Sequence, residues 1–151
     1  MNLWRGVFAA VVGRRLPRTT GSLSVEGVER PVRIRRDAHG IPVIEAQTEQ
    51  DAWLGLGFCE GQDRAFQLEQ MRRAVRGQLA EMAGPALLGI DRFMRRLGLR
   101  RAAEAQLSLL DERDRRSLEA FARGVNEGRG PLGSPRRAHE FMLLGVRPGE
   151  F

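Results

Sequence analysis

Three acidic residues stand beside or close to arginine in the chain and could in principle act as general acids: Asp37, Asp63 and Asp91. A neighbouring guanidinium favours the ionised carboxylate, and structural ion pairs of this kind are far commoner than catalytic ones. We therefore predict structural roles for all three. The chain is assigned no catalytic residue, no cofactor-binding residue and no metal ligand.

Cys59 is the only cysteine and the other candidate nucleophile. A nucleophilic thiol needs a nearby base, and both histidines, His39 and His139, are distant from it in the sequence. Because its neighbours are apolar residues and glycines, we predict that Cys59 is a small buried side chain, with the nucleophile as the alternative. The sequence contains no Gly-rich phosphate loop, H-E-x-x-H, cysteine pair or G-x-S-x-G. Nothing in it could perform chemistry by itself.

The first part of the chain carries strand patterns. Apolar and polar residues alternate over residues 23–25 and 32–35, the period of half-buried strands. The His39-Gly40 pair predicts a turn, and residues 41–46 a third short strand with Pro42 near its start. We expect a small antiparallel meander that contributes to the edge of a larger sheet.

The rest of the chain is predicted to be mostly helical. Residues 48–51 are typical of a helix N-cap and begin a long helix, kinked near its glycines and ended by Gly84-Pro85. Glu69 and Arg73 form an i, i+4 pair, worth about 0.2–0.5 kcal/mol on an exposed helix. The second half of this helix has one apolar face, made of Leu68, Met71, Val75, Leu79 and Met82.

A second N-cap is predicted at residues 111–114, and residues 128–135 are expected to form a loop. The helix between them has an apolar stripe of Leu118, Phe121, Ala122 and Val125.

Two pairs of adjacent charges, Arg36 with Asp37 and Asp63 with Arg64, need partners elsewhere. Neighbours in a strand point to opposite faces, and neighbours in a helix do not face each other. We predict a network that joins strand to helix, with Gln62 completing its hydrogen bonds.

Several blocks in fixed order resemble the penicillin acylase family. The first is R-D-A-H-G-I-P-V-I-E-A at residues 36–46, and the second is G-F-C-E-G-Q-D-R-A-F-Q-L-E at 57–69, followed by Arg72-Arg73. Val43 replaces the family's usual His, and Gly61 its usual Ala. The resemblance covers roughly residues 16–151. Further blocks are residues 77–81 with Gly84, Asp91, Arg95-Arg96, residues 120–126, Glu140-Phe141, Leu144-Gly145 and Pro148.

The resemblance implies an α+β fold, the N-terminal part of an N-terminal-nucleophile hydrolase αββα sandwich, with short antiparallel strands followed by mostly helices. It implies an autoproteolytic precursor whose second chain begins with the nucleophile, usually Ser, and hydrolyses linear amides such as acylated β-lactams or acyl-homoserine lactones. The expected partners are the remainder of that precursor and a small acylated amine. The resemblance allows calcium in the complete protein and favours a periplasmic or extracellular location. We expect this chain to be a fragment that is inactive alone.

The net charge of +6 comes from the N-terminus. Residues 1–36 hold eight Arg against two Glu, 8 − 2 = +6, whereas residues 37–151 hold 17 Arg and 17 acidic residues. We divide the chain into a basic leader or weak signal or anchor, residues 1–18, and a first-chain portion, residues 19–151, truncated at its C-terminus. The leader could meet a membrane surface, and no nucleic acid is expected as a partner. A noncatalytic remnant, or a basic module that binds membrane or nucleic acid, is the alternative reading of the whole chain.

Overall fold

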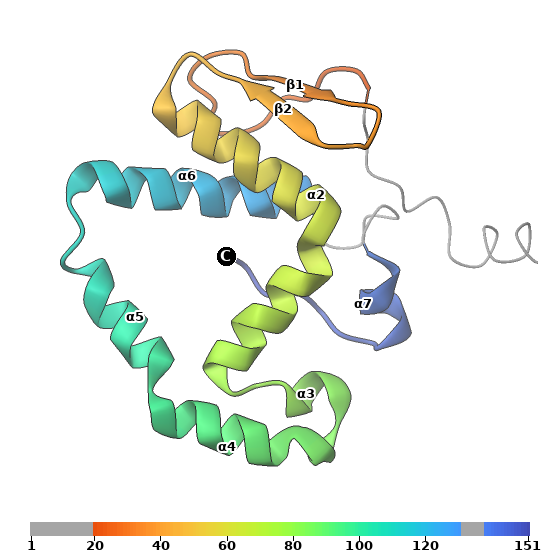
Figure 1. Ribbon diagram of the computed structural model, residues 1–151, viewed down its shortest axis with the longest axis vertical. Helices are drawn as coiled ribbons and strands as arrows, with labels where there is room; N and C mark the ends of the chain where they lie inside the picture. The colour runs from red at the N-terminus through yellow and green to blue at the C-terminus, as the bar shows by residue number, and fades with distance from the viewer. Residues whose placement is uncertain (1–19, 131–137) are drawn as a thin grey trace, which may run out of the picture.

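A computed structural model describes residues 20–130 and 138–151 of the chain. A two-stranded hairpin lies at one end of the molecule, and four helices, α2, α4, α5 and α6, frame an opening beneath it (Figure 1). The short helix α7 lies beside α2. The elements are β1 (Arg33–Arg36), β2 (Pro42–Glu45), α2 (Glu49–Arg76), α3 (Ala80–Ala83), the 3-10 turn η1 (Pro85–Leu87), α4 (Leu88–Leu97), α5 (Leu99–Leu107), α6 (Glu112–Gly128) and α7 (His139–Leu143).

The hairpin pairs β1 and β2 antiparallel, with Ile34 opposite Ile44. Asp37 builds the turn between them, because its carboxylate accepts the backbone N–H groups of His39 and Ile41, both at 2.8 Å. Gly40 has a φ of +81°, which favours a residue without a side chain. The predicted turn is confirmed.

The predicted strand at residues 23–25 is wrong. These residues are irregular, so the described sheet is a hairpin of two strands and not a meander. The segment that follows is bound to a helix instead of to a strand. The buried Asp51 accepts the backbone N–H groups of Glu29 at 2.9 Å and of Arg30 at 3.0 Å.

Helix α2 begins as predicted. The Thr48 hydroxyl accepts the Asp51 N–H at 3.1 Å, an N-cap that satisfies one of the free donors of the first turn. The kink is predicted at the glycines but lies at Arg64, whose φ of −134° and ψ of 21° depart from helical values.

The glycines of α2 serve a different purpose, a close crossing with α6. A Cβ on Gly57 would lie 2.1 Å from the Phe121 carbonyl oxygen, and one on Gly61 would lie 2.3 Å from that of Val125. On α6, a Cβ added to Gly124 or to Gly128 would likewise lie 2.1 Å from a backbone carbonyl oxygen of α2. Both helices carry the pair as G-x-x-x-G, which places two glycines on one helix face. Two backbones can therefore touch where side chains would hold them apart.

Helix α2 also ends earlier than predicted, at Gly77 and not at Gly84. Gly77 has a φ of +63°, and the N–H of Gln78 returns to the Arg73 carbonyl at 2.8 Å, a Schellman-type end. The buried carboxylate of Asp91 caps the N-terminus of the next helix, α3. It accepts the backbone N–H groups of Leu79 and Ala80, both at 2.8 Å.

Two apolar stripes differ from their prediction. The stripe on α2 is present in the sequence, but Met71 is 67% exposed, and the face that packs inward carries Ala65 and Glu69. Helix α6 begins at the predicted N-cap, because the Asp111 carboxylate accepts the Asp114 N–H at 2.8 Å. It ends at Gly128, which was predicted to be the first residue of the following loop. Leu118 of the α6 stripe is 49% exposed, and the residues that α6 buries are Ser117, Ala120, Gly124 and Val125.

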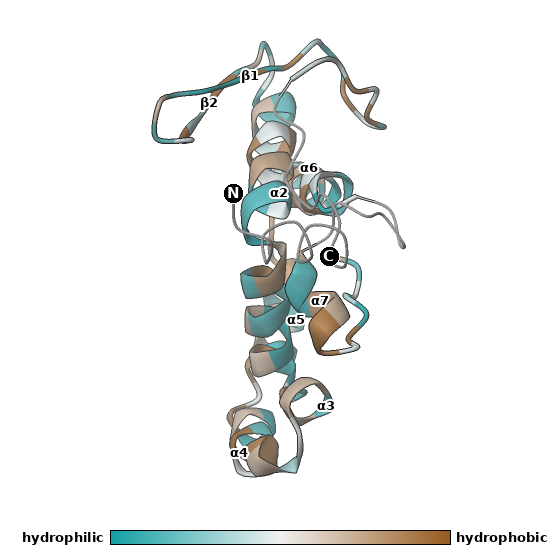
Figure 2. Cartoon of the chain, turned by 90° about the vertical axis from the view of Figure 1, so that its right-hand side faces the viewer, coloured by the Kyte–Doolittle hydropathy of each residue, from teal (hydrophilic) through white to brown (hydrophobic). Residues whose placement is uncertain are grey.

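The core of the described residues is small and lies mainly between α2 and α6. Helix α7 adds to it because Phe141 is buried against Phe66, with ring centroids 5.5 Å apart. Figure 2 shows hydrophobic residues in α4 and α7, and Phe93, Leu97, Met142 and Leu143 of these helices are exposed. The buried apolar residues are Leu54, Cys59, Ala65, Met82, Ala120, Val125 and Phe141.

Candidate functional site

The first polar cluster joins the hairpin to α2. The Arg36 guanidinium donates to both carboxylate oxygens of Asp63, at 2.8 and 2.9 Å, and to the Gln62 side-chain oxygen at 3.2 Å. A fourth bond reaches the Gly40 carbonyl at 2.9 Å. The hydrogen bond to Asp63 raises the pKa of Arg36, so the guanidinium stays charged. The predicted network between strand and helix is confirmed, and Asp37 stays outside it as the turn residue.

The second cluster is buried at Glu69, whose side chain has no exposed surface. Arg72 donates to both of its oxygens at 2.8 and 2.9 Å, and Arg73 donates to one at 2.6 Å. Burial disfavours the ionised carboxyl, but the hydrogen bonds from Arg72 and Arg73 outweigh burial and lower the pKa of Glu69. The predicted i, i+4 pair of Glu69 and Arg73 is confirmed, but the pair is buried, because both arginines turn inward onto one carboxylate.

This second cluster holds the C-terminal segment against α2. Glu69 accepts the backbone N–H of Gly149 at 3.2 Å, and Arg73 donates to the Arg147 carbonyl at 3.1 Å. Arg129, the C-cap of α6, donates to the Gly149 carbonyl. Residues 147–149 are thus fixed by side chains that lie far earlier in the sequence.

Phe151 is held by the same part of the molecule. Asn126 binds its backbone in both directions, accepting its N–H at 3.1 Å and donating to its carbonyl at 3.0 Å. The Arg72 guanidinium lies 6.0 Å from the centre of its ring, at the limit of a cation–π contact.

None of the candidate acids forms a catalytic pair. Asp37 shapes the hairpin turn, Asp63 binds Arg36, and Asp91 caps α3. Cys59 is 2% exposed, and burial raises the pKa of its thiol, which disfavours the reactive thiolate. The charged groups that act on it are Arg36, Asp63 and Glu60, with neither histidine among them. The prediction of a small buried side chain is confirmed.

An open hollow of about 1010 Å³ lies between residues 20–36, β2 and α2. Its lining includes the hydroxyls of Ser22 and Ser24 but no histidine, so a serine there lacks the usual base. Within residues 20–130 and 138–151, no group of three His, Cys, Asp or Glu side chains is arranged to hold a metal ion. No helix among those residues is long and apolar enough to cross a membrane.

Sequence reasoning missed that two acidic residues of α2, Asp51 and Glu69, are buried and bind distant segments. Asp51 accepts two backbone N–H groups from residues 29–30, and Glu69 accepts one from Gly149. A signal for Glu69 was present, since it is followed by two arginines at i+3 and i+4 in a helix. Asp51 carried no comparable signal because its partners are backbone groups.

The sequence matches a known protein family over most of its length. The family model of penicillin amidase matches residues 31–151. The chain belongs to the penicillin amidase family. An acyl-homoserine lactone acylase, QuiP, of Pseudomonas aeruginosa is 46% identical over 111 residues, which cover 74% of this chain and 13% of that protein. Penicillin acylase 2 proenzyme of Pseudomonas sp. is 40% identical over 133 residues, 88% of this chain and 17% of the proenzyme.

The fold agrees with this family. A thermostable penicillin G acylase from Alcaligenes faecalis superposes with a TM-score of 0.68 at 23% identity, over 80% of this chain and 65% of that chain. The predicted α+β fold of the N-terminal-nucleophile hydrolase type, with antiparallel strands followed by mostly helices, is confirmed. The chain spans less than a fifth of the length of the two Pseudomonas relatives.

Proposed function

We propose that the chain is the N-terminal part of an amide hydrolase precursor whose nucleophile comes from a later part of the same precursor. The match to an acyl-homoserine lactone acylase over 111 residues carries this proposal. The clusters at Asp63 and Glu69 lie in the blocks that carry the resemblance and bind other segments, and the thiol near the first cluster, Cys59, is buried with a raised pKa. The chain's own role is then to position helices, not to cut a bond.

The substrate class is an acylated amine whose amide bond is hydrolysed, with acyl-homoserine lactones preferred and acylated β-lactams next. The new N-terminal residue of a second chain, Ser, Cys or Thr, would attack the carbonyl, and its own α-amino group would accept the proton. That amine has an ordinary pKa of about 7.7–8.0, close to the working pH. The released products are the carboxylic acid and the free amine.

The test compares two purified proteins, residues 1–151 and the full reading frame, on an acyl-homoserine lactone and a chromogenic phenylacetyl amide. Residues 1–151 should release no product above buffer, and the full-length protein should process itself and turn over one of the substrates. Replacing the first residue of the second chain by Ala should abolish both events. Turnover by residues 1–151, or a full-length protein that processes but hydrolyses no amide, would contradict the proposal. A reading frame that stops at Phe151 would favour a noncatalytic remnant.

A further inference from the structure

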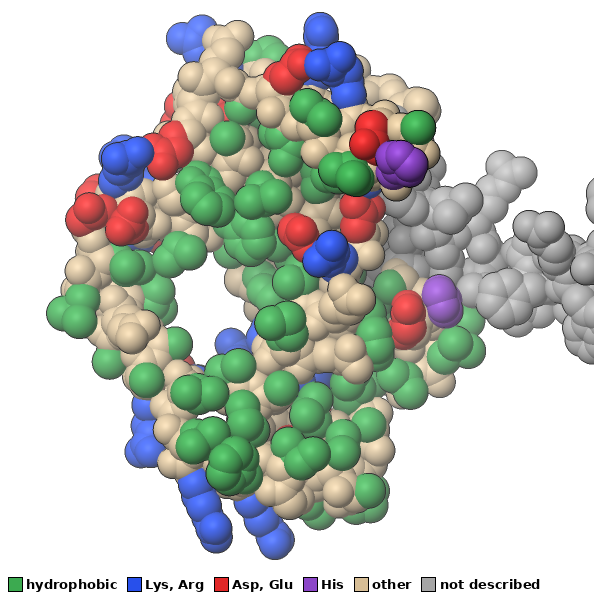
Figure 3. Space-filling model, viewed as in Figure 1, with side chains coloured by type: hydrophobic (Ala, Val, Ile, Leu, Met, Phe, Trp, Pro, Cys, Tyr) green, Lys and Arg blue, Asp and Glu red, His purple; other side chains and the backbone are tan. Residues whose placement is uncertain are grey.

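Helices α2, α4, α5 and α6 surround an opening that passes through the molecule (Figure 3). Hydrophobic side chains gather around its rim and over α4 in that view. All four helices carry large hydrophobic side chains that are at least 39% exposed: Met71 and Val75 on α2, Phe93 and Leu97 on α4, Leu99 and Leu107 on α5, and Leu118 on α6. Apolar surface of this extent marks an interaction site.

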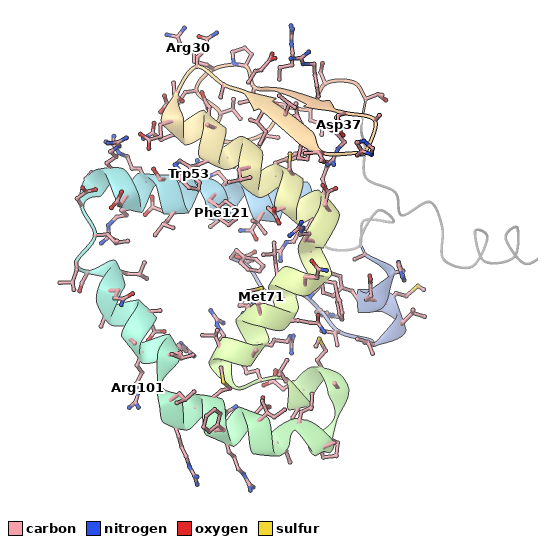
Figure 4. The ribbon with its side chains drawn as sticks, in the orientation of Figure 1. Arg30, Asp37, Trp53, Met71, Arg101 and Phe121 are labelled. Carbon is pink, nitrogen blue, oxygen red and sulfur yellow. The ribbon has the colours of Figure 1, made fainter. Side chains whose placement is uncertain are left out.

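Helix α2 has exposed apolar residues on the side that borders the opening. Met71 is 67% exposed and lies where α2 borders the opening (Figure 4), and Val75 stands one helical turn later at 39% exposure. The same helix buries a charged residue, Glu69, on its other side. An apolar stripe left outside while a carboxylate is buried indicates that a further segment covers the stripe.

On α4 the charged residues lie away from the large apolar ones. On α4 the residues Ile90, Phe93 and Leu97 share one face by their spacing, and Arg92, Arg95 and Arg96 lie on the opposite one. Arg101 of α5 points away from the opening (Figure 4). The occupant that fits an opening enclosed by four helices is an apolar polypeptide segment, and lipid is an outcome that the test below would detect.

The position of Phe151 indicates which segment this is. In Figure 1 the C-terminal end projects onto the frame of the four helices, and in Figure 2 it lies to one side of α2. Its backbone is fixed there by two hydrogen bonds to Asn126, and residues 147–149 are fixed by Glu69, Arg73 and Arg129. A chain that continues from this point starts beside α2 and α6, two of the helices that border the opening.

We propose that the segment that follows Phe151 in the longer precursor occupies the opening and covers the exposed apolar residues of α2, α4 and α5. The inference rests on the proposed function, because it requires a precursor longer than 151 residues. A longer precursor agrees with the length of the relatives, because only 13% and 17% of their sequences match this chain.

Photocrosslinking in the full-length protein tests this directly. Benzoylphenylalanine replaces Met71 in one variant and Leu99 in another, with Ile41 on the hairpin turn, 59% exposed, as the matched control. After irradiation, mass spectrometry should find both probes joined to peptides of the segment that follows Phe151 in the same molecule. The control should yield several-fold less of that product. Crosslinks to a second copy, to lipid, to residues 1–19, or to nothing would overturn the inference.

Substitution gives an independent measurement. Met71→Glu should lower the yield of soluble full-length protein several-fold, because it places a charge in an apolar contact, whereas Met71→Leu and Ile41→Glu should keep it. Equal yields from Met71→Glu and Ile41→Glu would contradict the inference. Amidase activity is assayed separately on the wild type: predicted crosslinks in a protein without amidase activity would overturn the proposed function alone, and an active amidase with other crosslinks would overturn this inference alone.

Discussion

Arg36 on β1 and Asp63 on α2 form a two-pronged ion pair, with N–O distances of 2.8 and 2.9 Å. The two residues come from different sequence blocks that resemble the family, and their side chains are only 16% and 32% exposed. The planar guanidinium fork fixes both distance and orientation between strand and helix. The pair therefore explains why an R-D block and a Q-D-R block occur in one chain although neither contains a catalytic group.

Replacing Asp63 by Ala should destabilise the full-length protein by about 1–3 kcal/mol, because Arg36 would lose its main partner in a half-buried place. The yield of processed enzyme should fall while the rate per active site stays near that of the wild type. Active-site titration together with the steady-state rate separates the two quantities. Glu45→Ala is the control: Glu45 pairs with Arg35 on the same hairpin, but both side chains are exposed, so its cost should stay below about 1 kcal/mol. A normal yield with a rate near zero would instead make Asp63 catalytic.

Replacing Glu69 by Gln should cost more, about 3–5 kcal/mol, because two arginines would lose a buried partner. Glu104→Gln is a matched control, since Glu104 pairs with Arg100 at i−4 on the exposed helix α5 and should cost no more than about 0.5 kcal/mol. Chemical denaturation of the full-length protein measures both. Equal costs for the two variants would show that burial of Glu69 adds nothing.

The same residue predicts a dependence on pH. The pKa of Glu69 is lowered in the folded protein, so its stabilising contribution is complete above the ordinary glutamate pKa of about 4.3. The contribution is lost as the pH falls from there through the folded pKa. Unfolding free energies of the wild type and Glu69→Gln should therefore converge as the pH is lowered below about 4. A difference that stays constant down to the lowest pH at which the protein folds would contradict the assignment.

Local signals predicted the parts of the fold that depend on near neighbours in the chain. The caps at Thr48 and Asp111 and the turn at Gly40 each satisfy backbone groups within a few residues, so the sequence alone was sufficient. The strand expected at residues 23–25 failed because backbone groups just beyond it bind Asp51, a side chain more than twenty residues away. Nothing in the local pattern records such a partner.

The glycines of α2 and α6 show the same limit. Gly57 and Gly61 weaken a helix, and a kink is the natural prediction for them in a single sequence. Their actual role depends on a second helix that carries its own glycines 67 residues later. The blocks that resemble the family show which segments follow one another in the sequence, but only the structure shows which of their residues are in contact.

Gly57→Ala should therefore destabilise the protein by well over the usual point-mutation cost of about 1 kcal/mol, because its Cβ would meet a backbone oxygen at 2.1 Å. Gly89→Ala is the matched control within α4, where an added Cβ meets nothing within 4 Å. That variant should be stabilised by about 0.5–1 kcal/mol through the helix preference of Ala over Gly. Thermal unfolding of both variants in the full-length protein gives the comparison. Two glycines that tolerate Ala equally would mean that α2 and α6 do not cross this closely.

Residues 1–151 alone should be loosely folded and should bind a dye that reports exposed apolar surface. The apolar residues around the opening have no cover among the described residues, and the buried core is only a few side chains. Heating the purified chain should therefore give a broad transition with strong dye fluorescence at the start, whereas the full-length protein should give a sharp transition and little initial fluorescence. Met71→Ser should lower the dye signal of residues 1–151 and leave that of the full-length protein unchanged. A sharp transition from a monomer of residues 1–151 that binds little dye would mean that the chain folds completely without the rest of the precursor.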